Sequence, residues 1–256
     1  MAGRKNPIQK AHTPYRLTIG PALIYFLFLW ADLPGSPLGP ASSYLKFAGM
    51  ILLFALTIYV QAGRIDLWTL AAGLTVPCDY LLLFTSRWTM GIALFSLVQS
   101  LRLIQRRSGK KNPAAFPCRP PQGCADKSNA SFPQRLRIVA VFVALAFLPL
   151  AFLPADFRFI YSLLFYLTLL LLNLFDALQG RTNILIGSYV LFFLCDLSVG
   201  LSHLLPPSAF ASVVSFMIWF FYFPSQYGFV FYCLSSQETD REQNAGQRAK
   251  GSSEKG

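Results

Sequence analysis

Stretches of about 20 mostly apolar residues recur along the sequence, and they limit the possible folds more than any other feature. A bilayer core about 30 Å thick needs roughly this many residues in one helix. Only 13% of the 256 residues are charged, whereas 54% are hydrophobic. A soluble domain usually carries about 25% charged residues, and one water-soluble core cannot bury so much apolar length. The sequence therefore predicts an all-α, polytopic membrane protein.

The hydropathy pattern predicts a bundle of eight transmembrane helices over residues 15–235. A cytoplasmic segment, 1–14, is expected before the bundle and a disordered cytoplasmic tail, 236–256, after it. The connection at 106–135 is rich in Pro, Gly, Lys and Arg, which is typical of a flexible basic linker. The eight spans are expected at residues 15–31, 44–62, 67–86, 88–105, 136–153, 157–178, 183–203 and 209–235.

The distribution of the 22 Lys and Arg residues predicts the orientation in the membrane. If the N-terminus is cytoplasmic, eight spans leave 19 of these residues on the cytoplasmic side and three, Lys46, Arg87 and Arg158, outside. Positive residues accumulate in cytoplasmic loops, and an odd number of spans would remove this bias. Both termini are therefore expected in the cytoplasm.

The linker divides the spans into two groups of four, which suggests a weak internal repeat. The third span of each group carries the dipeptide Cys-Asp, as Cys78-Asp79 and Cys195-Asp196. Each Asp lies about seven residues before the expected outer end of its span, or roughly 10 Å below that boundary. Parallel repeats are one known way to build a membrane protein. The two acids are therefore expected at equal depth.

These two acids are the strongest candidates for chemistry, because a carboxylate in hydrocarbon costs several kcal/mol unless it is paired, solvated or protonated. Asp79 and Asp196 have no Lys or Arg one helical turn away. Two acids at one depth favour a shared polar cavity, and polar faces on the third, fourth, seventh and eighth spans support it. The alternative is a pair of interhelical hydrogen bonds that stabilise the bundle.

The residues alone leave two functions open. In a hydrolase, one carboxyl group would donate a proton and the other would activate water. In a transporter, the same two groups would relay protons. No metal is expected, because clusters of three His, Cys or carboxylate ligands are absent from the spans, and we expect neither a cofactor nor a nucleic-acid partner. The oligomeric state is left open.

Short motifs in these spans resemble the YhhN-like lysoplasmalogenase family of eight-span membrane proteins. The likeness extends from about residue 44 to 235 and depends on the order and spacing of the motifs. The family's Gly-Asp-x-x-Leu corresponds to Cys-Asp-Tyr-Leu-Leu at residues 78–82, with Cys in place of Gly. Its Leu-Phe-x-Leu-Ser-Asp and Tyr-Tyr-x-x-Gln correspond to Leu-Phe-Phe-Leu-Cys-Asp at 191–196 and Tyr-Phe-Pro-Ser-Gln at 222–226. The Lys of its second span, and the aromatic, Gly and Phe of its fourth, correspond to Lys46, Trp88, Gly91 and Phe95.

The chain departs from the family pattern on the fourth span. The family usually has His-x-x-Tyr after the Phe, and these positions are Gln99 and Arg102 here. The missing His removes a proton shuttle or a headgroup contact, so the departure bears on the activity and leaves the expected fold unchanged.

The resemblance implies hydrolysis of the vinyl-ether bond of a lysoplasmalogen, a membrane lipid, to a fatty aldehyde and a glycerophospho-headgroup. Asp79 and Asp196 would then be the catalytic acid and base, in either order. Tyr222 and Gln226 would orient water or the ether oxygen. Lys46, at the outer mouth, would meet the phosphate, and Gln99 takes the position of the family's His in the substrate site. A proton-coupled lipid or solute transporter and a catalytically silent lipid-binding relative are the competing hypotheses.

Overall fold

The computed structural model describes residues 13–33, 35–61, 66–85, 87–111, 132–180, 182–204 and 210–253. Within these residues the chain forms eight α-helices and no strand, which confirms the predicted all-α fold class. A short 3-10 helix, η1 (Gly39–Ala41), precedes the second of them. The α-helices are α2 (Thr13–Ala31), α3 (Ser42–Val60), α4 (Leu67–Phe84), α5 (Trp88–Lys111), α7 (Phe132–Phe152), α8 (Ala155–Gln179), α9 (Asn183–Leu204) and α10 (Phe210–Ser253).

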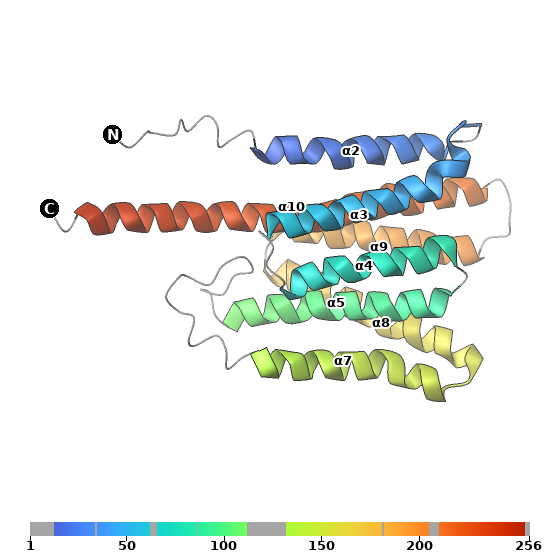
Figure 1. Ribbon diagram of the computed structural model, residues 1–256. Helices are drawn as coiled ribbons and strands as arrows, with labels where there is room; N and C mark the ends of the chain where they lie inside the picture. Colours follow the sequence, from blue (N-terminus) through green and yellow to red (C-terminus); the bar gives the residue numbers. More distant parts are fainter. Residues whose placement is uncertain are drawn as a thin grey trace.

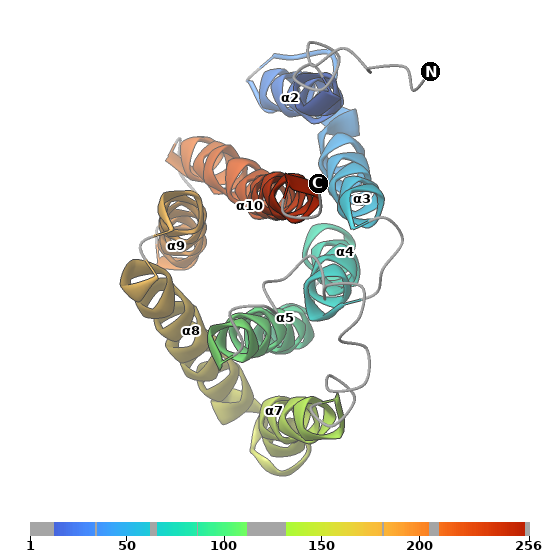
Figure 2. The ribbon, with the colours of Figure 1, turned by 90° about the vertical axis from the view of Figure 1, so that its left-hand side faces the viewer.

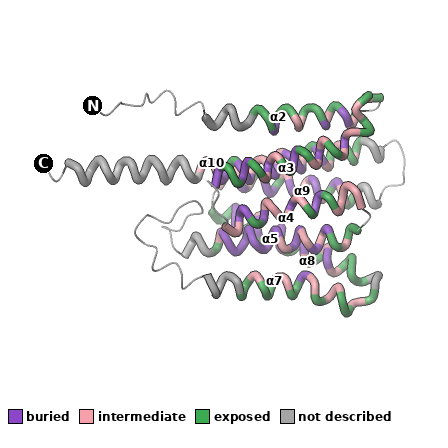
Figure 3. The backbone as a smooth tube through the Cα atoms, in the orientation of Figure 1, coloured by how far each residue is buried: buried purple, intermediate pink, exposed green. Residues whose placement is uncertain are grey.

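The helices have the length and surface of a multi-pass membrane protein. In the described part of the chain, five segments are long and apolar enough to cross a membrane, and α2 and α7 contain shorter apolar stretches. Large apolar side chains are exposed along the outer faces of the helices, whereas the buried residues face one another (Figure 3). The five segments are Gly39–Val60, Leu67–Phe84, Phe157–Gln179, Asn183–Leu201 and Val213–Ser235.

Helix α5 is a predicted span that does not reach the same apolarity. Its buried face contains polar residues among apolar ones, and buried polar groups in a membrane are stable only where neighbouring helices supply hydrogen-bond partners. The helix packs against α4, α7 and α8, which surround it with protein. The buried polar residues of α5 are Ser96, Gln99, Ser100, Arg102 and Gln105.

Six of the helices form a closed ring, in which each packs against the next in the order α3, α4, α5, α8, α9, α10 and back to α3 (Figure 2). The remaining two lie outside the ring on opposite sides: α2 packs against α3 and α10, and α7 packs against α5 and α8. The polar side chains discussed below project into this ring.

The packing pattern repeats between the two halves of the chain. Helices α2 to α5 correspond to α7 to α10, and each helix contact has a counterpart under this correspondence. The contacts α4–α5 and α9–α10 correspond, as do α5–α8 and α10–α3. The suspected parallel repeat is therefore present in the helix arrangement. Helices α4 and α9, which carry the two Cys-Asp dipeptides, occupy equivalent positions.

Both peripheral helices are attached at a proline. A proline inside a helix has no N–H to donate to the carbonyl four residues earlier. In α10, Pro224 leaves the carbonyl of Phe220 free, and the Tyr25 hydroxyl of α2 donates to it at 3.1 Å. In α7, the carbonyl of Leu145 precedes the internal proline by one turn, and it accepts from the Tyr161 hydroxyl of α8 at 2.7 Å. Each tyrosine hydroxyl thus pairs with a main-chain carbonyl that the proline of the neighbouring helix leaves without a donor.

The end of the chain corrects one prediction. Residues 236–256 were expected to be disordered, but α10 continues as a helix through Ser253. The segment is rich in helix-favouring Gln, Glu, Arg, Lys and Ala. It also extends a helix that is already formed, so it avoids the unfavourable nucleation step. Residues 254–256 lie outside the described residues.

The linker between the two halves is shorter than expected. Helix α5 continues through Lys111 and α7 begins at Phe132, so both ends of the predicted 106–135 linker are helical. Residues 112–131 lie outside the described residues, and so do residues 1–12 of the predicted N-terminal segment. The flexibility predicted for the linker remains a prediction for residues 112–131.

Candidate functional site

Asp79 lies on α4 and points into the ring. Its side chain is buried, with 2% of the residue exposed. The Tyr222 hydroxyl of α10 donates to Asp79 Oδ1 at 2.7 Å. Asp79 Oδ2 has no hydrogen-bond partner in the described part of the chain. Because α4 and α10 are not neighbours in the ring, this hydrogen bond crosses its interior and leaves one carboxyl oxygen available.

Asp196 lies at the equivalent place on α9 but has a different partner. The Tyr166 hydroxyl of α8 donates to Asp196 Oδ2 at 2.7 Å. Helices α8 and α9 are neighbours, so this hydrogen bond runs along the ring. Asp196 is also partly exposed, whereas Asp79 is fully buried. Sequence reasoning did not identify Tyr166, because the motifs of α9 give no sign of a partner on α8.

The two carboxyl–hydroxyl pairs are connected by aromatic side chains. The Phe95 ring of α5 lies 6.2 Å from the Tyr222 ring and 6.3 Å from the Tyr166 ring, centroid to centroid. The tyrosines that bond the two acids therefore pack against one ring, that of Phe95. A single cavity shared by the two carboxyl groups remains a prediction.

Gln226 lies one helical turn from Tyr222 on α10 and binds a buried arginine. Arg102 Nη2 of α5 donates to Gln226 Oε1 at 2.9 Å. The guanidinium carbon of Arg102 lies 3.8 Å from the centroid of the Phe229 ring and 5.8 Å from that of Trp68, as in cation–π contacts. The spacing of three residues between Gln99 and Arg102 predicted that both lie on the polar face of the fourth span, but it gave Arg102 no role in the site.

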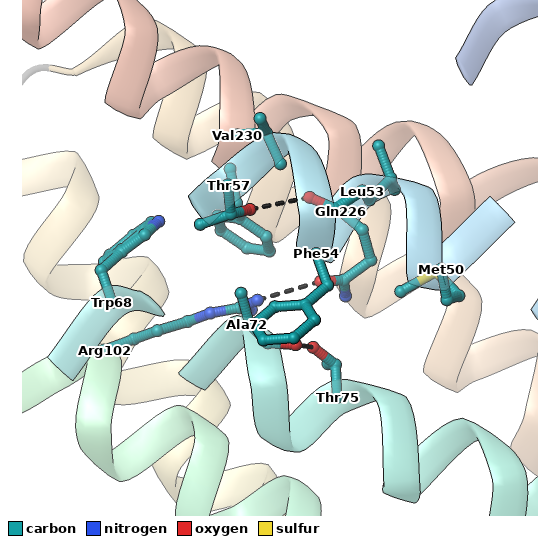
Figure 4. A pocket seen from close by; sticks show the side chains of 11 residues that line it. Met50, Leu53, Phe54, Thr57, Trp68, Ala72, Thr75, Arg102, Gln226 and Val230 are labelled. Atoms are coloured by element: carbon teal, nitrogen blue, oxygen red, sulfur yellow. Dashed lines mark hydrogen bonds between the residues drawn. The ribbon is translucent and has the colours of Figure 1, made fainter. Parts of the chain in front are cut away.

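Arg102 and Gln226 line a small pocket between α3, α4, α5 and α10 (Figure 4). Its volume is about 20 Å³, which is room for about one water molecule. Neither Asp79 nor Asp196 lines it. The lining residues are Met50, Leu53, Phe54, Thr57, Trp68, Ala72, Thr75, Arg102, Gln226, Phe229 and Val230.

Gln99 belongs to a hydrogen-bonded network at the contact between α5 and α8. Asn173 Nδ2 donates to the Gln99 main-chain oxygen at 2.9 Å and to its Oε1 at 3.4 Å. The Tyr189 hydroxyl donates to Asn173 Oδ1 at 3.2 Å. Arg106 donates to the Asn173 main-chain oxygen at 3.0 Å and pairs with Asp176 at 3.1 Å. These contacts hold Gln99 in place, and its predicted role in binding substrate remains a prediction.

Lys46 is paired with an acid that the sequence analysis did not assign to it. Lys46 Nζ lies 2.8 Å from Asp32, which follows the end of α2, and Ser42 Oγ also donates to this carboxylate. The ammonium group lies 5.3 Å from the centroid of the Trp219 ring. Trp219 in turn packs against Tyr222, with 5.2 Å between centroids. Lys46 therefore reaches the aromatic cluster beside Asp79, with its charge compensated by Asp32.

Comparisons of this chain with protein-family models, curated proteins and solved structures gave no match. Among the described residues, no group of three or more His, Cys, Asp or Glu side chains is placed to hold a metal ion. The arrangement contains two carboxyl groups, each fixed by a tyrosine hydroxyl, and a guanidinium group with amide donors beside it. Such groups are suited to proton transfer and to binding a negatively charged or polar ligand.

Proposed function

We propose that the chain is a membrane-embedded hydrolase that resembles the lysoplasmalogenases and cleaves the vinyl-ether bond of a lysoplasmalogen. The products are a fatty aldehyde and a glycerophospho-headgroup. The observation that carries the proposal is that Asp79 and Asp196 lie on equivalent helices and each accepts a hydrogen bond from a tyrosine whose ring packs against Phe95.

The reaction needs an acid and a base in a place where water is scarce. A carboxylic acid protonates the β-carbon of the vinyl ether, which creates an oxocarbenium ion. A water molecule that has given up a proton to the second carboxylate adds to this ion. The resulting hemiacetal then separates into the aldehyde and the free glycerol hydroxyl. One carboxyl group donates the first proton and the other activates the water, which is the usual division of roles in acid–base catalysis.

The surrounding residues suit the other parts of this reaction. The bond from the Tyr222 hydroxyl fixes the orientation of the Asp79 carboxyl group, and Gln226 lies one turn away. In the proposal Tyr222 and Gln226 orient the water or the ether oxygen. Lys46, which is paired with Asp32 in the structure, contacts the phosphate of the substrate at the outer mouth in this proposal. Gln99 of α5 contacts the substrate as well.

The proposal includes an orientation with both termini in the cytoplasm. The start of α2 and the end of α10 lie at the same end of the bundle (Figure 1). In the predicted topology 19 of the 22 Lys and Arg residues lie on the side of the two termini and three on the other side. Cysteines introduced singly at residues 237 and 87, in a background without the native five, would test it in sealed right-side-out vesicles. A membrane-impermeant thiol reagent is expected to label the second and to spare the first.

The activity is tested by aldehyde release from a lysoplasmalogen by the purified chain. Asp79→Asn and Asp196→Asn are each expected to lower the rate by about 10²-fold to 10⁴-fold, the usual contribution of an acid or base. Asp66→Asn is the matched control, because Asp66 caps the first turn of α4 and Asn caps a helix equally well. Thermal unfolding of each variant checks that it is folded. Full activity in both folded variants removes the two acids from the reaction.

A proton-coupled transporter is the second candidate, since a carboxyl group bonded to a tyrosine hydroxyl is also an element of a proton relay. This function predicts flux of a lipid or solute driven by a pH gradient in liposomes, and no aldehyde. A chain that shows neither activity would be a lipid-binding relative without catalysis.

A further inference from the structure

Arg102 differs from the other buried cations of the chain. Lys46 is paired with Asp32, and Arg106 is paired with Asp176. Arg102 is 3% exposed, and no carboxylate pairs with it within the described residues. A buried charge is unfavourable unless an opposite charge or several hydrogen bonds compensate it. Arg102 has only a neutral amide and two aromatic rings as partners, so its charge is incompletely compensated.

Two hydrogen-bond donors remain open beside this charge. In the described part of the chain, Arg102 Nη1 and Gln226 Nε2 are buried and have no acceptor. Both residues line the same pocket, and they come from different helices, α5 and α10 (Figure 4). The hydroxyl groups of Thr57 and Thr75, which also line it, donate to main-chain oxygens of their own helices. The pocket thus offers N–H donors and a positive charge, but no acidic group.

The rest of the pocket is apolar. Met50, Leu53 and Phe54 of α3 and Val230 of α10 line it beside the charged end. Phe54 of α3 and Ala72 of α4, which also line the pocket, are partly exposed. A ligand that matches these walls has a negatively charged polar head and an apolar chain. The volume of about 20 Å³ is room for one water-sized group, so a single oxygen of the head enters the pocket and the rest of the ligand lies outside it.

We propose that Arg102 and Gln226 form a binding site for the oxyanion head of an amphipathic molecule, whose chain lies against the apolar wall of α3. The head is a carboxylate or a phosphate, and Arg102 donates to it through Nη1 while Gln226 donates through Nε2. Such charge-assisted bonds to a planar guanidinium are among the stronger ones in proteins. The site contains neither aspartate but shares Gln226 with the proposed hydrolase, and it does not depend on the polypeptide being a hydrolase.

Equilibrium binding of radiolabelled palmitate to the full chain in phosphatidylcholine nanodiscs tests this site, with empty nanodiscs as the blank. Saturable binding is expected, with at least a tenfold loss of affinity in Arg102→Met. Arg158→Gln is the control, because Arg158 is exposed at the other end of the bundle, and it is expected to bind as the unmodified chain does. Unchanged palmitate and lysophosphatidate binding in Arg102→Met overturns the proposal.

Gln226→Glu provides a second test if Arg102→Met fails to fold. The new carboxylate would pair with Arg102 and take the place of the ligand's oxyanion. This variant is expected to unfold at a higher temperature than the unmodified chain without ligand, and to lose palmitate binding. A folded Gln226→Glu variant that binds palmitate with unchanged affinity contradicts the proposal.

Competitors identify the source of the oxyanion. Displacement of the label by palmitate but not by 1-palmitoyl lysophosphatidate indicates a free carboxylate as the ligand. Stronger displacement by lysophosphatidate, or saturable binding of lysophosphatidate alone, indicates a lipid phosphate, and both results support the site. Equal displacement by hexadecanol shows that the charge is not recognised. Equal displacement by inorganic phosphate shows that the ligand's apolar chain is not recognised. Either of these last two results overturns the proposal.

Discussion

The two halves of the bundle share a helix arrangement and differ in the polar groups that it carries. Asp79 and Asp196 stand at equivalent places on α4 and α9, yet the first bonds to α10 across the ring and the second bonds to the neighbouring helix α8. Different apolar side chains of similar volume can form the same helix contact. A hydrogen bond instead needs a particular donor at a particular distance from its acceptor. An internal repeat can therefore preserve the helix positions while the chemistry of its halves diverges.

The outer ends of the halves differ in the same way. The first half joins α2 to α3 through the buried pair of Asp32 and Lys46. At the corresponding turn of the second half, Arg158 Nε donates to the Leu153 main-chain oxygen at 2.8 Å in an exposed position. The same helical turn is thus closed by an ion pair in one half and by a hydrogen bond to the backbone in the other.

Asp32→Asn is expected to have the largest effect on stability. It leaves the Lys46 charge buried without its carboxylate, and loss of one partner of a buried ion pair costs about 3–5 kcal/mol. Arg158→Gln, the counterpart in the second half, is expected to cost under about 0.5 kcal/mol, as exposed substitutions usually do. Reversible unfolding in detergent measures both, and equal losses would show that the two turns are equivalent after all. If Asp32→Leu with Lys46→Met restores stability but not aldehyde release, Lys46 contacts the substrate.

Gly228→Ala is expected to cost about 1–3 kcal/mol, the usual penalty for overpacking. A Cβ at Gly228 would overlap Ser188 Oγ, which is held by a 2.8 Å bond to the Ile184 main-chain oxygen. At Gly91, in the corresponding helix contact, a Cβ would lie 2.8 Å from a terminal methyl of Leu82, which can rotate away. Gly91→Ala should therefore cost less in the same unfolding measurement. Ser188→Ala should recover part of the loss at Gly228, and no recovery would contradict the overlap.

Tyr222→Phe is expected to destabilise the chain by about 1–2 kcal/mol, the cost of leaving a buried acceptor unpaired. The reason is that Asp79 is fully buried and its Oδ2 already has no partner within the described residues. Tyr166→Phe should cost less, because Asp196 is partly exposed and, in the proposed function, faces a cavity from which water can replace the hydroxyl. Unfolding of the two variants side by side measures the difference. A larger loss for Tyr166→Phe would reverse the contrast between the two acids.

Removal of residues 237–256 is expected to have the smallest effect, under about 0.5 kcal/mol, because the segment is polar. The mean residue ellipticity of the truncated chain reports whether the end of α10 is helical in solution. A large loss of stability would show that the end of α10 packs on the bundle in a way its composition does not suggest.

Hydropathy predicted the helix count and the positions of most helix starts, because each span must satisfy its own backbone in lipid. The helix ends were less predictable, as α5 and α10 show: both continue into polar sequence, where apolarity gives no signal but helix propensity persists. The inward direction of Asp79 followed from the cost of a carboxylate in hydrocarbon, since only the ring interior offers a partner.

The partners of these groups could not be predicted from the sequence. Tyr166 and Asp196 are 30 residues apart on different helices, and Tyr222 and Asp79 are 143 apart. Only the rotation of one helix against another decides which hydroxyl reaches which carboxyl group. The burial of Arg102 could not be predicted for a related reason. A charge near the end of a span usually extends to the membrane surface, and only side chains of α3, α4 and α10 enclose this one.

The prolines of α7 and α10 determine how the outermost helices are retained. Between two helices in hydrocarbon, the hydrophobic effect supplies little attraction, because lipid tails are as apolar as the side chains they replace. The unpaired carbonyl of Phe220 would cost several kcal/mol if it faced acyl chains, and the Tyr25 hydroxyl prevents this. Departure of α2 from the bundle would therefore leave the Phe220 carbonyl and the Tyr25 hydroxyl unpaired in hydrocarbon. The proline in α10 thus creates the hydrogen bond that retains α2.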